Sequence, residues 1–110
     1  MDSNIEALIK SAKRHCKITW EDEDTAQDIT DIVEDAIPFM QHKLGIPADK
    51  VPQVFVDAGE ERRLFKEYCL YCWNNMKSEF ETNYKSEILT VRHKYEVEAA
   101  RNETEATGSV

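Results

Sequence analysis

The sequence predicts an all-α protein: a small bundle of about four helices, with a long central aromatic helix, a long loop containing proline and glycine, and a mobile polar C-terminal tail. Two observations predict this fold class. Apolar residues recur at intervals of three and four over most of the chain, which is the period of a helix with one buried face. The chain has 110 residues, 41% of them apolar, which suits one core and not two. We therefore expect one helical domain over residues 1–97 and a flexible tail over residues 98–110.

The first helix is expected from residue 4 to residue 15. Ser3 and Glu6 have the spacing of a capping box, and the apolar residues that follow keep to helical spacing: Ile5, Leu8, Ile9 and Ala12. Residues 16–23 then form a link. In this link Ile18 and Trp20 alternate with polar residues, and we expect them to pack into the core as an apolar clasp.

The second helix is expected from residue 24 to residue 44. Its apolar residues keep to one face: Ile29, Ile32, Val33, Ala36, Ile37, Met40 and Leu44. Gly45 is suited to end this helix, because glycine readily adopts the left-handed conformation found after a helix. Pro38 lies inside the helix, so we expect a kink near residues 34–37 or a break there.

A loop and a third helix follow. Residues 45–59 contain two prolines and two glycines and are expected to be one long loop, in which only residues 54–56 pack. The third helix is expected over residues 60–84, with apolar and aromatic residues over more than half of its circumference. Leu70 falls on its otherwise polar side, where it is either an ordinary exposed leucine or a subunit contact.

The C-terminal part of the chain has the weakest pattern. A fourth helical stretch over residues 85–97 carries its apolar residues sparsely. Such a stretch does not fold alone, so it either packs on the third helix or waits for a partner. Residues 98–110 are polar and have no apolar period, which predicts the mobile tail.

The three cysteines, Cys16, Cys69 and Cys72, do not indicate a disulfide framework, because their number is odd. A zinc site would need two ligands besides Cys69 and Cys72, and the three histidines lack the spacing of ligands. We expect these two cysteines to be small buried side chains.

Acidic side chains form a ridge along the outside of the predicted second helix. On a helical wheel, Asp24, Asp28, Asp31 and Asp35 fall within about 60° of one another, roughly opposite the apolar stripe. Residues 18–42 contain no lysine or arginine that would neutralise them. Residues 21–24 do not begin a calcium loop, because the sixth position lacks the required glycine. A magnesium-dependent hydrolase would need paired acids that face a shared interior, whereas these acids face outward.

The sequence indicates neither an enzyme nor a cofactor. It has no G-x-S-x-G motif, no cysteine and histidine pair with an orienting acid, and no glycine-rich phosphate loop. A net charge of −8 argues against a free-standing nucleic-acid binder. No apolar run is long enough to cross a bilayer, and the first ten residues are unlike a signal peptide. We expect a protein that is made in a cytoplasm and acts by binding other proteins.

The order of these parts resembles the head-tail connector proteins of long-tailed bacteriophages and related prophages, which are also called head-completion, neck-adaptor or DNA-packaging proteins. The resemblance covers roughly residues 3–97. It rests on a short first helix, an I-T-x-(D/E)-rich clasp over residues 18–24, an apolar second helix that ends in LGIP, and an aromatic helix that runs into FETNYKSEILTVRHKYEV.

The resemblance implies a structural adaptor in the neck of a virion, made in the cytoplasm of the bacterial host. Such proteins form a ring, typically twelvefold, beneath the portal protein. The ring extends the DNA channel and links the head to the next neck, stopper or tail protein, and DNA passes through it without specific binding. The family has no catalytic residues and no cofactor. Its C-terminal segment reaches the portal, which implies docking by the helix from about residue 86, with these candidate contacts: Ile88, Leu89, Val91 and Tyr95.

A ring with rotational symmetry needs two different patches on each subunit. The candidate acidic patch comprises Glu21, Asp22, Glu23, Asp24, Asp28, Asp31 and Asp35, and the candidate basic patch comprises Lys10, Lys13, Arg14 and Lys17. The acidic ridge would line the channel, where its charge keeps DNA from sticking, or contact a neighbouring subunit, or face only water. Channel lining is slightly favoured.

A function of a different class is the alternative: an acidic helical regulator, such as a DNA-mimicking inhibitor that occupies the basic groove of a host nucleic-acid enzyme. Such a mimic needs acids at phosphate-like spacing over a whole face. Here the acids concentrate in one ridge, which makes this function the second choice.

Overall fold

The computed structural model describes residues 3–20 and 22–108, with side chains as far as residue 102. Over these residues the chain forms six α-helices, one short 3-10 helix and no strand, which confirms the all-α class. The elements are α1 (Ser3–His15), α2 (Glu23–Leu44), η1 (Ala48–Lys50), α3 (Gln53–Val56), α4 (Glu60–Trp73), α5 (Lys77–Asn83) and α6 (Lys85–Gly108).

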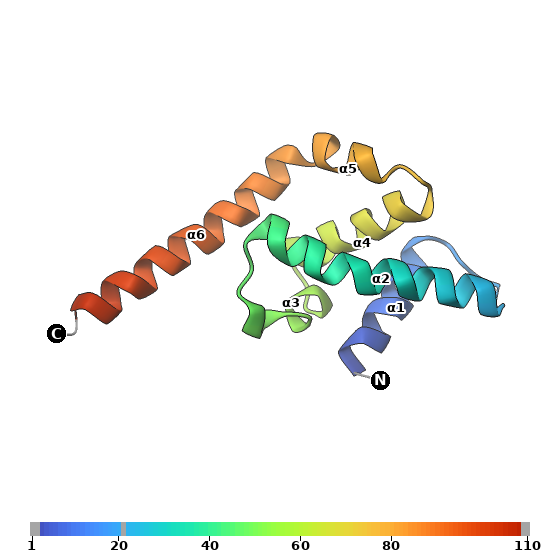
Figure 1. Cartoon of the computed structure of the whole chain (residues 1–110), viewed down its shortest axis with the longest axis horizontal. Coiled ribbons are helices and arrows are strands. Elements are labelled where there is room, and N and C mark those ends of the chain that lie inside the picture. The colour runs from blue at the N-terminus through green and yellow to red at the C-terminus, as the bar shows by residue number, and fades with distance from the viewer. Residues whose placement is uncertain (1–2, 21, 109–110) are drawn as a thin grey trace.

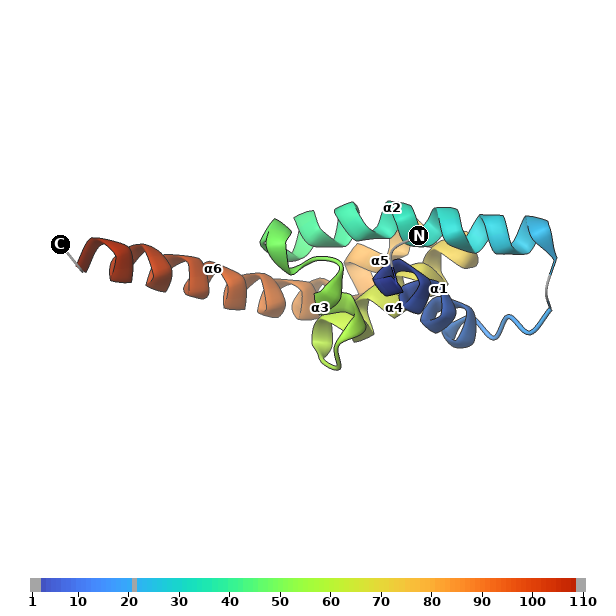
Figure 2. The same cartoon turned by 90° about the horizontal axis from the view of Figure 1, so that it is seen from below.

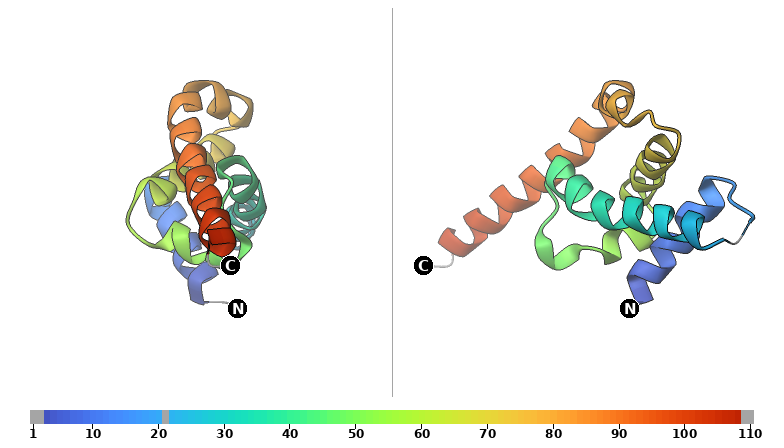
Figure 3. Two further views of the ribbon diagram at one scale, coloured as in Figure 1. Left: turned by 90° about the vertical axis from the view of Figure 1, so that its left-hand side faces the viewer. Right: turned by 45° about the vertical axis from the view of Figure 1, so that its right-hand side comes forward.

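The helices form a two-layered body with an arm. In Figure 2, α2 lies in one layer and α1, α3 and α4 lie in the other. Helix α6 starts beside α5, crosses the end of α2 and continues away from the body (Figures 1 and 3). The chain measures 58 × 32 × 19 Å along its principal axes, and the arm accounts for the longest dimension.

The core lies between the two layers and is rich in aromatic rings. Phe55 of α3 stacks on Phe65 of α4 with ring centroids 4.6 Å apart. Phe39 of α2 stacks on Tyr68 of α4 at the same distance, and Phe80 of α5 meets the edge of Tyr68. These rings hold α2, α3 and α5 against α4 and against one another.

Helix α2 agrees closely with its prediction. Asp22 caps its start by accepting a hydrogen bond from the backbone N–H of Thr25 at 3.1 Å. Gly45 ends it in the left-handed conformation, with φ of 67°. The helix continues through Pro38 without the expected break. Both Pro38 and Glu34 are exposed, so water can hydrate the Glu34 carbonyl that proline leaves without a donor.

The third predicted helix is two helices, which corrects the expectation of one helix over residues 60–84. Helix α4 ends after Trp73, and α5 begins at Lys77. Between them Asn75 adopts a left-handed conformation with φ of 60°, and Met76 N–H donates to the carbonyl of Tyr71 at 2.7 Å. This is the usual hydrogen bond that ends a helix, and asparagine tolerates the conformation better than other residues with a Cβ.

Two other boundaries differ from the predictions. The segment expected as one loop over residues 45–59 contains η1 and α3, because Phe55 is fully buried and anchors a turn of helix against α4. The helix expected over residues 85–97 is α6 and continues to Gly108, through most of the expected tail. The mobility of that tail stays a prediction.

The predicted apolar clasp is half right. Ile18 is buried in the core. Trp20 is 51% exposed, and its indole N–H donates to the Thr25 hydroxyl at 2.9 Å. This hydrogen bond holds the ring on the outside of the α2 N-terminus, because the acceptor lies at the surface.

Candidate interaction surfaces

The predicted acidic ridge is a continuous exposed surface on α2, which we call the acidic face. Its described residues are all exposed: Asp22, Glu23, Asp24, Asp28, Asp31 and Asp35. Glu21, the remaining candidate, lies outside the described residues. None of the six takes part in an ion pair with a described residue. The acidic face therefore keeps its full charge available to a partner.

Two local hydrogen bonds organise the acidic face. The bond from Thr25 favours the ionised form of Asp22 and lowers the pKa of that carboxyl. Asp31 accepts a hydrogen bond from the side chain of Gln27, one turn earlier, at 2.8 Å. Asp22 is charged at neutral pH, and its charge interacts favourably with the positive end of the α2 dipole.

The predicted basic patch becomes part of a groove between α1 and α4. This basic groove has a volume of about 460 Å³ and is lined by Ser11, Arg14, His15, Lys17, Lys66 and Leu70. Arg14 and Lys17 belong to the predicted patch, whereas Lys10 and Lys13 lie on α1 outside the lining. Lys66 and Leu70 come from α4 and were not part of the prediction.

The cations of the groove are not neutralised within the chain. Among the described residues, neither Arg14 nor Lys17 nor Lys66 forms an ion pair. His15 is held by Glu67, with Nε2 and Oε1 2.8 Å apart, and Glu67 also accepts from the Tyr84 hydroxyl at 2.8 Å. Leu70 is half-buried and adds an apolar wall. The groove is therefore suited to an acidic partner that also presents apolar atoms.

Three of the four candidate portal contacts are in the protein's own core, which corrects the prediction for them. Ile88, Val91 and Tyr95 of α6 are buried, and α6 packs on α2, α4 and α5. The first half of α6 thus packs on the bundle and does not wait for a partner. Of the four, Leu89 alone is accessible to a partner, with 53% of its surface exposed. It lies in a shallow groove with Lys43, Lys85 and Arg92.

Glu61 is a buried carboxylate that the sequence did not single out. It is 7% exposed, and it accepts hydrogen bonds from Lys94 Nζ at 2.7 Å and from the Tyr95 hydroxyl. Burial opposes its ionisation, but the hydrogen bonds from Lys94 and Tyr95 outweigh that effect and hold the pKa of Glu61 below its usual range. These bonds join α4 to α6, which makes the site a structural clamp.

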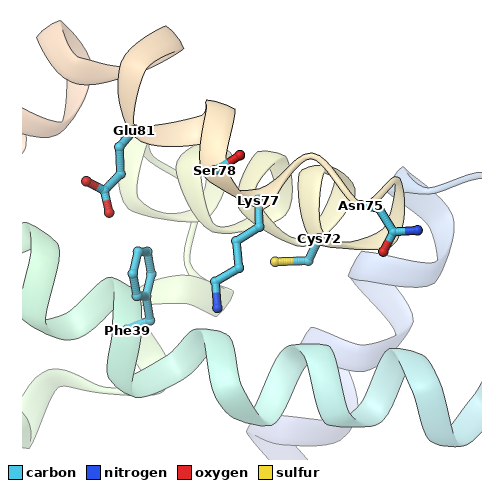
Figure 4. Close-up of a pocket in the computed structure, with 6 residues that line it drawn as sticks. All are labelled: Phe39, Cys72, Asn75, Lys77, Ser78 and Glu81. Atoms are coloured by element: carbon cyan, nitrogen blue, oxygen red, sulfur yellow. The ribbon is translucent and has the colours of Figure 1, made fainter.

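A surface pocket with a volume of about 520 Å³ lies between α2 and α5 (Figure 4). Lys77 extends from α5 between Phe39 and Cys72, and its ammonium lies 5.9 Å from the centroid of the Phe39 ring. Burial, as the largest cause, raises the pKa of the Cys72 thiol, so the thiol is protonated and a poor nucleophile at neutral pH. The pocket therefore presents an amphiphilic surface, with the Phe39 ring beside charged and polar side chains.

Cys16 and Cys69 are buried free thiols, as expected for Cys69, and burial raises the pKa of the Cys16 thiol to about 11. Cys72 is only half-buried, which corrects the expectation for that residue. Within the described part of the chain, no three histidine, cysteine or acidic side chains come together as metal ligands would. Nor does any helix in that part have the length and apolarity needed to span a bilayer.

Comparisons of the chain with protein-family models, with curated proteins and with solved structures found no match. The resemblance to phage connector proteins therefore stays a prediction. What the structure provides is a set of surfaces: the acidic face of α2, the basic groove between α1 and α4, and the projecting half of α6.

Proposed function

We propose that the protein is a structural adaptor in the neck of a phage virion. In this function it forms a ring, of twelve subunits in the typical case, beneath the portal protein. The ring extends the DNA channel and offers a platform for the next neck or tail protein. The protein acts by binding and carries out no reaction.

The projecting half of α6 is the observation that carries this proposal. Its first half is fixed to the body by Ile88, Val91 and Tyr95, whereas residues 99–102 are exposed. Residues 98–108 continue the same helix for roughly 16 Å, at a rise of 1.5 Å per residue. A rigid arm of this kind suits docking into a neighbouring ring, because little conformational freedom is lost when it binds.

The arm also changes where the docking contacts are expected. Since Ile88, Val91 and Tyr95 serve the core, portal binding falls to residues beyond Tyr95 and to the exposed Leu89. Val97 is also exposed and follows the buried Tyr95 by two residues. The proposed docking element is therefore the part of α6 from residue 96 onward.

The decisive experiment is co-expression with the portal protein of the same genome, followed by co-purification and electron microscopy. The full chain should co-purify with the portal as a ring at one end of the particle. A chain that ends at residue 97 should keep its fold and lose the portal. A chain with residues 98–110 in shuffled order is the matched control, and it should also lose the portal if specific side chains make the contact.

Two outcomes count against the adaptor. One is a full chain that does not associate with the portal. The other is a chain ending at residue 97 that binds as well as the full chain. If a lysate pull-down instead captured a host DNA-binding enzyme in a salt-sensitive way, the regulatory alternative, which the exposed unpaired acids of α2 favour, would replace it.

A further inference from the structure

We infer that the basic groove between α1 and α4 is the binding site for the acidic face of α2 from a second copy of the same chain. The contact is head-to-tail, so each subunit uses its groove toward one neighbour and its acidic face toward the other. This inference rests on the proposed function in that it names the partner surface by which the ring closes. It assigns the acidic face to a subunit contact in place of the channel lining that the sequence slightly favoured.

The charges of the two surfaces are complementary, and neither set forms an ion pair with a described residue. Arg14, Lys17 and Lys66 supply three positive charges at the groove without an ion pair among the described residues. The acidic face supplies six described carboxylates, which also form no ion pair with a described residue. A protein with a net charge of −8 repels its own copies, so association requires that its unpaired cations meet the acids of a neighbour.

The two surfaces point to opposite sides of the molecule. The acids lie on the side of α2 away from its buried residues, which include Ile29 and Val33. Lys66 and Leu70 lie on the side of α4 away from its buried residues. Helices α2 and α4 pack on each other in the core, and Figure 2 shows them in different layers. The outer surfaces of the two helices therefore face away from each other.

Opposite placement decides the symmetry of the contact. One chain cannot fill its own groove, because both surfaces belong to helices packed in one core. A two-fold dimer would place the same patch against itself, which here would set acid against acid or base against base. A head-to-tail contact pairs unlike charges and leaves both end subunits open to further copies, which produces a ring when the rotation closes.

The groove also accommodates the shape of the neighbour. Four of the acids, at positions 24, 28, 31 and 35, follow one another at intervals of three and four residues and so form a narrow ridge along α2. The groove between α1 and α4 is an open channel between two helices, with Leu70 as an apolar wall. The stems of the lysine and arginine side chains add further apolar contact area to this wall.

Two charge-reversal variants test the inference. The groove variant carries Arg14→Glu and Lys66→Glu, and the face variant carries Asp28→Lys and Asp31→Lys. Sedimentation of the wild-type chain at low salt should give a mass that rises with concentration and returns to 12.8 kDa in high salt. Each variant alone should stay a monomer at concentrations where the wild type associates.

The mixture of the two variants gives the sharpest result. The groove variant still offers an acidic face and the face variant still offers a basic groove, and the two reversed surfaces also carry opposite charges, so the 1:1 mixture should associate although neither variant does so alone. A control variant with Asp49→Lys and Glu79→Lys changes the net charge by the same amount as the face variant, at exposed positions outside both surfaces. It should associate at least as well as the wild type. Circular dichroism should show equal helix content in all variants.

Several outcomes would overturn the inference. These are a wild type that stays monomeric at low salt, a mixture that stays monomeric, and a control that loses association as the face variant does. Binding of duplex DNA by the wild type that the groove variant lacks would assign the groove to phosphate instead. Portal binding with a monomeric mixture would remove only this inference, whereas a mixture that associates without portal binding would remove only the adaptor.

Discussion

Replacing Glu61 by alanine should destabilise the protein by roughly 3 kcal/mol, because Glu61 clamps α4 to α6. The change leaves the buried Tyr95 hydroxyl without its acceptor, and a hydrogen bond to a charged group contributes about 1.5–3 kcal/mol. The bond from Lys94 adds at most about 1 kcal/mol, because the Lys94 side chain is 48% exposed and returns to water. For a chain of this size the melting temperature should fall by about 10 °C.

Glu60 provides the matched control for this prediction. It is the neighbouring residue and also forms an ion pair, with Arg63 at 2.9 Å, but both partners are exposed. Glu60→Ala should therefore cost at most about 0.5 kcal/mol in urea unfolding at neutral pH. A double-mutant cycle isolates the bond between Glu61 and Tyr95. In a Tyr95→Phe background, which lacks this bond, Glu61→Ala should lower the free energy of unfolding by at least about 1 kcal/mol less than it does in the wild type.

The same clamp gives a pH dependence with a defined sign. The folded-state pKa of Glu61 is lowered, so its contribution to stability is fully present above the unfolded value of about 4.3 and is lost as the pH falls through the folded value. The stability difference between the wild type and Glu61→Gln should therefore shrink below about pH 4. Equal costs for the Glu60 and Glu61 variants at neutral pH would refute the reasoning.

Two other changes test the turn and thiol assignments. Asn75→Gly should raise the free energy of unfolding by about 0.5 kcal/mol, because glycine adopts the left-handed conformation without strain, and a loss of stability in urea unfolding would contradict this. Iodoacetamide at pH 8 should label Cys72 slowly in the native protein and leave Cys16 and Cys69 unmodified, whereas all three react in urea. Mass spectrometry of the peptides measures this, and fast labelling of Cys69 would show that the α4 core opens.

The sequence predicted those parts of the fold that depend on local pattern. Helices α1 and α2 have strong apolar periods and residues suited to their ends, so their bounds follow from neighbours along the chain. The division between α4 and α5 was missed because the apolar pattern continues across it. The two consecutive asparagines, Asn74 and Asn75, were the available signal, since asparagine is the residue other than glycine that most often ends a helix in this way.

Of the two interaction surfaces, the acidic face could be predicted from local pattern and the complete basic groove could not. The acidic face lies on one helix, so a helical wheel is enough to find it. The basic groove joins α1 to α4, and no local pattern shows that Arg14 lies beside Lys66, which is 52 residues away. In the sequence Glu61 looks like an ordinary acid of a first helical turn, because its partners on α6 are more than 30 residues distant.

The final prediction concerns the rigidity of the arm. The far half of α6 contacts the body near its start, where Glu98 forms an ion pair with Lys50 at 3.5 Å, and a short isolated helix in water is marginal. It is helical here because the packed half, anchored by Val91 and Tyr95, serves as the nucleus and each further residue adds a hydrogen bond. Replacing Ala99 and Ala100 by glycine lowers helix propensity by about 1 kcal/mol per residue, at exposed positions outside the core.

This double variant separates arm rigidity from arm sequence. It should leave the melting temperature within about 2 °C of the wild type, because at exposed sites most of the propensity cost appears as fraying of the arm and not as global unfolding. Helix content by circular dichroism should fall, and so should affinity for the portal, because the arm would then have to order on binding. Unchanged portal affinity with a frayed arm would show that docking needs the side chains alone, and the rigid-arm explanation would then be wrong.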